Sequence, residues 1–197
     1  MQIKPAVSRT TIINFTIVIQ AGLLLVATVW SYFSGVSLGA YLAFNYKAML
    51  IGCAVGVAMA VAGYLLLKLA RTANILPQLR DTVDNFLTPL FSTVNRFDII
   101  LIASLAGFCE EVFFRGVIQH QFGIVLASIA FALLHDPSLR NITYTITALV
   151  YGFILGYLFI FTGSLWAPIV AHGVYDLIIL LLLRYWLKPP ASPVGQR

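Results

Sequence analysis

The chain has 197 residues, of which 60% are hydrophobic and only 10% are charged, and its mean hydropathy is +0.95. A soluble domain carries about 25% charged residues, so this chain has too little polar material to cover a globule in water. The net charge of +5 comes from scattered basic residues, which argues against a nucleic-acid partner and leaves the lipid bilayer as the expected environment.

Six apolar segments follow one another along the chain, and a membrane-crossing helix needs about 20 predominantly apolar residues. The fourth segment is short and ends in LLHDP, so we expect it to stop inside the protein beside a polar cavity. The sequence therefore predicts one all-α integral membrane domain, 1–197, with about six transmembrane helices that enclose a polar intramembrane cavity. The segments lie at 12–33, 48–70, 97–121, 123–135, 141–161 and 164–187.

Two stretches of the chain fall outside these segments. Residues 71–96 mix Leu, Ile and Phe with Arg and Asp at rough helical spacing and are broken by Pro77 and Pro89. This pattern favours an amphipathic interfacial segment, although a solvated loop would also fit. Residues 188–197 are predicted to form a flexible tail.

The basic residues predict the orientation of the helices, because loops on the cytoplasmic side are enriched in Lys and Arg. With six crossings, only Lys47 falls near one side, and Arg115 lies within the membrane. We therefore expect a multi-pass membrane protein with both termini in the cytoplasm. Its short loops and small size favour a prokaryotic cytoplasmic membrane. The basic residues expected on the cytoplasmic side are Lys4, Arg9, Lys68, Arg71, Arg80, Arg96, Arg140, Arg184, Lys188 and Arg197.

The two glutamates of the chain, Glu110 and Glu111, both lie in the third apolar segment. Each ionisable group in a membrane segment costs about 2.5–3.5 kcal/mol and is functional by default. Glu111 and Arg115 are four residues apart, so they are expected to pair and to support the helix. Glu110 is rotated by about 100° from Glu111 and lacks such a partner.

Two histidines are expected at the same depth as Glu110. At about 1.5 Å per residue, Glu110, His135 and His172 lie roughly 16, 18 and 13 Å from the same side of the membrane. In an apolar pocket a carboxylate suits a general base acting on water, one imidazole can hold that water, and a second can donate to an oxyanion. These residue types indicate a hydrolase without a covalent intermediate. His120 is expected at the interface, and Cys109 is expected to pack in the core.

Three motifs in order, EEVFFR, FALLH and HGVYD, resemble those of the CAAX-protease and bacteriocin-processing family, also called ABI, of intramembrane glutamic proteases. The resemblance covers about 97–180. It implies that Glu110 and His135 activate a water, that His172 and Asp176 line the oxyanion side, and that Phe131 supports the site. Asp176 stands where eukaryotic CAAX proteases have Asn, so it must be protonated or must orient His172 instead.

The expected activity is hydrolysis of a peptide bond in a membrane-associated protein or peptide substrate, with no cofactor. Its nearest rival is a zinc-dependent membrane protease whose metal is bound by Glu110, His135 and His172. A non-catalytic scaffold or bacteriocin immunity protein also fits the sequence, as does a proton-coupled transporter. The sequence predicts neither the identity of the substrate nor the oligomeric state.

Overall fold

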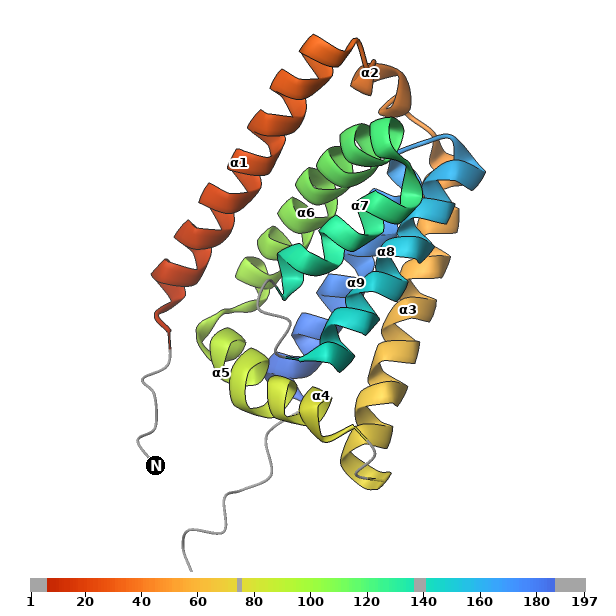
Figure 1. Ribbon diagram of the computed structural model, residues 1–197. Coiled ribbons are helices and arrows are strands. Elements are labelled where there is room, and N and C mark those ends of the chain that lie inside the picture. The colour runs from red at the N-terminus through yellow and green to blue at the C-terminus, as the bar shows by residue number, and fades with distance from the viewer. Residues whose placement is uncertain (1–6, 74–75, 137–140, 187–197) are drawn as a thin grey trace, which may run out of the picture.

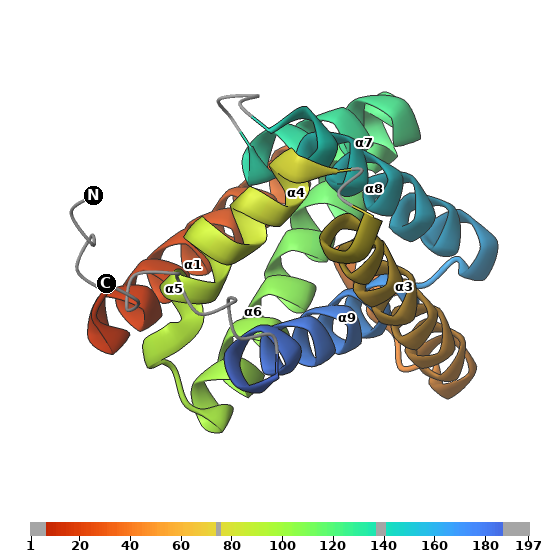
Figure 2. The ribbon, with the colours of Figure 1, turned by 90° about the horizontal axis from the view of Figure 1, so that it is seen from below.

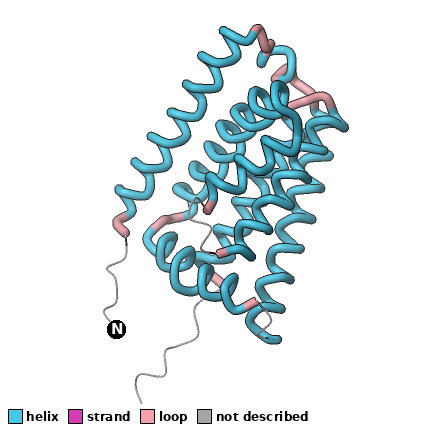
Figure 3. The backbone as a smooth tube through the Cα atoms, viewed as in Figure 1, coloured by secondary structure: helices cyan, strands magenta, loops and turns pink. Residues whose placement is uncertain are grey.

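The computed structural model describes residues 7–73, 76–136 and 141–186, and every regular element in these ranges is helical (Figures 1 and 3). The predicted tail at 188–197 lies outside the described residues, as do Lys4, Arg140, Lys188 and Arg197. The elements are α1 (Arg9–Ser34), α2 (Leu38–Tyr41), α3 (Tyr46–Ala73), α4 (Pro77–Thr82), η1 (Val83–Leu87), α5 (Thr88–Leu90), η2 (Phe91–Thr93), α6 (Arg96–Phe113), η3 (Phe114–Gln119), α7 (His120–His135), α8 (Ile142–Thr162) and α9 (Trp166–Tyr185).

Within the described residues, five helices are long and apolar enough to cross a membrane, which confirms an all-α membrane fold. Their number differs from the predicted six because the third and fourth predicted segments form one helical stretch, Arg96–His135. Gly123 interrupts this stretch with φ 82° and ψ 169°, a backbone conformation that residues other than glycine rarely adopt. The chain reverses there, and α7 runs back beside the preceding helix (Figure 1). Its last residue, His135, lies beside Glu110 in the last turn of α6. The fourth segment therefore ends inside the protein, as expected.

The bundle is held together by close helix packing around α9, which contacts α3, α6 and α8. A Cβ atom at Gly56 of α3 would lie 2.5 Å from the carbonyl oxygen of Ala171, and one at Gly107 of α6 would lie 2.8 Å from the backbone nitrogen of Gly173. Only glycine allows these backbones to approach so closely, as in small-residue contacts between membrane helices. These contacts place α6 and α9, which carry most of the candidate site residues, next to each other.

The predicted amphipathic segment is an almost continuous helical run from Pro77 to Thr93 that lies across one end of the bundle (Figures 1 and 2). Pro77 occupies the first turn of α4, where a missing N–H is tolerated. Pro89 lies near the start of α5, so neither proline breaks the run. Leu79 and Val83 face the core, while an ion pair between Arg71 and Asp84 ties the run to the end of α3.

Helix α1 lies on the outside of the bundle along α6 (Figure 1). Among its 26 residues, only Ile12, Gln20 and Ala27 are buried. Large apolar side chains on its other faces, such as Phe15 and Leu25, are exposed. Exposed apolar side chains are stable where lipid tails surround them, so α1 presents one narrow face to the protein and the remainder to the expected bilayer.

Candidate active site

Glu110 and His135 meet where the end of α7 approaches the last turn of α6. The Nε2 atom of His135 lies 3.9 Å from Oε2 of Glu110. On the other side of the imidazole ring, Nδ1 lies 2.9 Å from the carbonyl oxygen of Phe131. A carbonyl only accepts hydrogen bonds, so Nδ1 carries a proton and the Nε2 edge of the ring faces Glu110.

Glu111 forms a second, fully buried cluster beside the first. Its Oε2 atom lies 3.0 Å from Nε of Arg115, and both side chains have 0% exposure, so the pair expected from the i,i+4 spacing is present. Its Oε1 atom accepts from Nδ1 of His172 at 2.9 Å. On the opposite side of that ring, Nε2 is 3.5 Å from Oδ2 of Asp176. Glu111 therefore orients His172 and pairs with Arg115 at the same time.

The ring of Phe131 packs against a histidine of each cluster, His135 and His172. Its ring centroid is 4.4 Å from that of His135 and 5.7 Å from that of His172, and the guanidinium carbon of Arg115 lies 5.1 Å from the same centroid. The ring is buried. Since imidazole rings packed against an aromatic ring have few free rotamers, Phe131 restricts the orientation of both histidines.

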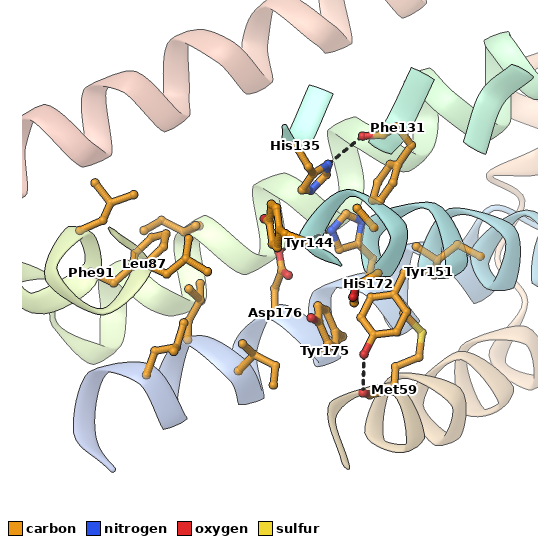
Figure 4. A pocket seen from close by; sticks show the side chains of 18 residues that line it. Met59, Leu87, Phe91, Phe131, His135, Tyr144, Tyr151, His172, Tyr175 and Asp176 are labelled. Carbon is orange, nitrogen blue, oxygen red and sulfur yellow. Dashed lines mark hydrogen bonds and ion pairs between the residues drawn. The ribbon is translucent and has the colours of Figure 1, made fainter. Parts of the chain in front are cut away.

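A cavity of about 240 Å³ reaches the site from the end of the bundle at which α5 lies. His135, Tyr144, His172 and Asp176 project toward it (Figure 4). The other part of its wall is apolar and comes from η1, α5, η2 and α9. Figure 4 shows two of those side chains, Leu87 and Phe91, away from the polar group. The apolar wall contains Leu87, Leu90, Phe91, Ile179, Leu180 and Leu183.

Two residues near the site were missed by sequence reasoning. Gln20 of α1 donates from Nε2 to Oε1 of Glu110 at 2.7 Å, and Tyr144 of α8 lines the cavity. Gln20 is the one amide in the apolar run FTIVIQAGLLL, so an unpaired polar residue within a membrane helix is the signal that was available. Tyr144 has no such signal, because tyrosine is ordinary in apolar helices.

His120 lies apart from the site, whereas Cys109 directly precedes Glu110 in α6. His120 is exposed and contacts the hydroxyl of Tyr41 at 3.3 Å, and Cys109 is buried. Across the described ranges, no group of three His, Cys, Asp or Glu side chains is placed to hold a metal ion. His172 faces Glu111 and Asp176 rather than the pair of Glu110 and His135.

The fold and the site together define a multi-pass membrane protein with a carboxylate–imidazole site inside its helical bundle. Residues 92–178 match the sequence model of the family described as Type II CAAX prenyl endopeptidase Rce1-like, which confirms the family resemblance carried by the three motifs. The chain is also 34% identical over 96 residues to the uncharacterized protein YpbD of Bacillus subtilis (strain 168). This match covers 49% of the chain and 51% of that relative, so the chain spans about half of the relative's length. No solved structure matches the chain.

Proposed function

We propose that the protein is an intramembrane endopeptidase in which Glu110 and His135 activate a water molecule for attack on a peptide bond. The observation that carries the proposal is the pairing of Glu110 Oε2 and His135 Nε2 at 3.9 Å, beside a cavity that His135, His172 and Asp176 line. One water molecule can bridge two polar atoms at this separation. The family match over 92–178 supports the same class of reaction.

In the first step, the bridging water donates one proton to Oε2 of Glu110 while its oxygen bonds to the carbonyl carbon of the substrate. The lone pair of His135 Nε2 accepts the second hydrogen bond of the water and so orients its attack. The hydrogen bond from Nδ1 to Phe131 O, at 2.9 Å, keeps His135 in the tautomer that this role requires. A base must lie within hydrogen-bond reach of the proton or one water away, and this pair meets that condition.

As the bond between the water oxygen and the carbonyl carbon forms, the carbonyl π bond breaks and the carbonyl oxygen becomes an oxyanion that His172 stabilises. Nδ1 of His172 donates to Glu111 at 2.9 Å, whereas the contact of Nε2 with Asp176 is 3.5 Å long and correspondingly weak. Because Nδ1 already donates to Glu111, Nε2 carries a proton only when His172 is an imidazolium, and in this form Nε2 can donate to a substrate oxygen in the cavity. Donors fixed in advance are an effective way to stabilise such charge. Glu110 then returns its proton to the leaving nitrogen as the carbon–nitrogen bond breaks.

The residues that line the cavity also indicate the class of substrate. Its polar part, with His135 and His172, would face the peptide bond, and its apolar part at α5 and α9 would bury an apolar side chain or lipid group. The proposed substrate is accordingly a membrane-associated protein or peptide with an apolar segment next to the cleavage position.

The experiment compares the peptide termini in membrane proteomes of cells that express wild-type protein, Glu110→Gln or His120→Gln at equal levels. Glutamine preserves the shape of Glu110 but removes the base, and His120 lies apart from the site. We expect termini that disappear with Glu110→Gln and persist with His120→Gln, which would also identify the substrate. Identical termini in all three samples would contradict the proposal.

The same cleavage assay distinguishes a reaction without a cofactor from a zinc-dependent one. We propose that the reaction needs no cofactor, since the three residues that would bind zinc, Glu110, His135 and His172, form no three-ligand group within the described part of the chain. Cleavage by purified protein should then continue in 1,10-phenanthroline. Loss of cleavage that added zinc restores would favour the metal-dependent reaction instead.

We further propose that the end of the bundle carrying α4 and α5 faces the cytoplasm. Arg9 begins α1, Arg71 lies near the end of α3, and Arg184 lies near the end of α9, all at this end, whereas Lys47 lies at the start of α3 at the other. The variant Lys47→Cys should react with an impermeant maleimide in intact cells. Reaction of Arg80→Cys instead of Lys47→Cys would show that the end carrying α4 and α5 faces away from the cytoplasm.

A further inference from the structure

Gln20 is the central residue of the narrow face that α1 presents to the protein. It is 6% exposed and is the one polar residue among the three that α1 buries. Its Nε2 atom lies 2.7 Å from Oε1 of Glu110, and a carboxylate accepts, so the amide nitrogen is the donor. An amide buried without a partner is costly, so this contact has to be made whenever α1 is docked.

Two further contacts set the height and rotation of α1 along α6. At one end, Nε and Nη2 of Arg9 donate to the two carboxylate oxygens of Asp98, each at 2.6 Å. At the other end, the indole nitrogen of Trp30 donates to Oε1 of Gln121 at 2.9 Å. The position of the Gln20 amide is therefore fixed from both sides and does not depend on its own contact alone.

The two carboxylate oxygens of Glu110 consequently face different partners. Oε1 accepts from Gln20 at 2.7 Å, whereas Oε2 faces Nε2 of His135 at 3.9 Å. A neutral amide fixes the carboxylate without neutralising it, whereas an arginine would form an ion pair. The oxygen that faces His135 therefore keeps its lone pairs available for a proton.

We propose that Gln20 is a positioning residue for the reaction: its amide holds one oxygen of Glu110 so that the other points at the attacking water. This inference rests on the proposed function. Residue 20 lies outside the segment that matches the family model, 92–178. It thus assigns α1 a part in the chemistry in addition to its contact with lipid.

The charged and titratable groups around Glu110 come from three other elements. His135 faces it from α7, and Arg115 of η3 and Tyr144 of α8 lie within electrostatic range. Replacing Gln20 by Met, which has nearly the same length and no donor, leaves all three in place. The Arg9–Asp98 and Trp30–Gln121 contacts remain as well, so α1 should still dock.

The experiment measures how fast Glu110 reacts with dicyclohexylcarbodiimide, which modifies protonated carboxyl groups in apolar surroundings. Wild-type protein, Gln20→Met and the matched variant Gln78→Met, whose side chain is exposed on α4 away from α1, are labelled in liposomes between pH 6 and 8. The tryptic peptide 97–115 is then analysed by fragment-ion mass spectrometry, which separates Glu110 from Glu111. Loss of one hydrogen bond to an ionised group should raise the labelling rate in Gln20→Met about 10- to 100-fold, with Gln78→Met unchanged.

The second readout is cleavage of the peptide whose processing depends on Glu110. Gln20→Met should lower kcat about 10- to 100-fold with KM within about twofold, because the base is displaced and the cavity is intact. Equal labelling rates, or an equal loss of kcat in Gln78→Met, would overturn the proposal. Faster labelling in Gln20→Met together with a wild-type protein that cleaves nothing would refute the proposed function and with it any catalytic role of Gln20, while the contact itself would stand.

Discussion

Replacement of Arg115 by Met tests the buried ion pair that supports the site. Arg115 and Glu111 both have 0% side-chain exposure, and their contact is 3.0 Å long. Methionine preserves most of the side-chain length but leaves the carboxylate of Glu111 with His172 as its remaining partner. Breaking one side of a buried pair costs about 3–5 kcal/mol, which for a chain of this size corresponds to a fall in Tm of at least about 6 °C.

The stability of these variants is measured through the reactivity of a cysteine of the chain. Cys109 is buried and Cys53 is exposed, so in a Cys53→Ser background a thiol-reactive dye reports unfolding through Cys109. The double variant Glu111→Gln, Arg115→Met should recover part of the loss, because it no longer buries an uncompensated charge. A cost below about 1 kcal/mol for Arg115→Met, which is typical of exposed pairs, would refute the reasoning.

Two further predictions concern packing and the oxyanion side of the site. Gly107→Ala should lower Tm, because its Cβ would lie 2.8 Å from the backbone nitrogen of Gly173. Gly22→Ala should leave Tm unchanged, because no heavy atom lies within 4 Å of the new Cβ. Thermal unfolding in detergent compares the two variants, and equal stability would contradict the packing account. Asp176→Asn should retain cleavage within about tenfold, because the amide can still contact His172, whereas Asp176→Leu should lose more than that. Equal rates for the two Asp176 variants would remove any role for this side chain.

The features that depend on hydropathy and helical spacing were predictable from the sequence. Runs of apolar residues predicted the membrane helices, and the i,i+4 spacing predicted the pairing of Glu111 with Arg115. The helical rise placed Glu110, His135 and His172 at one depth, and the structure brings Glu110 beside His135. These features are local, because they follow from the period and rise of a helix.

The contacts that were not predicted depend on how helices rotate against one another. His172 lies at the depth of both glutamates, but the rotation of α9 against α6 directs Nδ1 to Glu111 rather than to Glu110. The partner of Glu110 on its other side, Gln20, is 90 residues away in the chain, and the docking of α1 depends on contacts at both of its ends. Helical periodicity within one segment carries no information on such rotations.

The central claim is that Glu110 is the base of a hydrolytic reaction inside the membrane. The most direct measurement is the cleavage rate of the peptide identified from the membrane proteome, by purified protein in liposomes, for wild type, Glu110→Gln and His120→Gln. We predict that Glu110→Gln lowers kcat by at least about 100-fold, with unchanged Tm, and that His120→Gln retains the wild-type rate. Cleavage by Glu110→Gln at the wild-type rate would contradict the account.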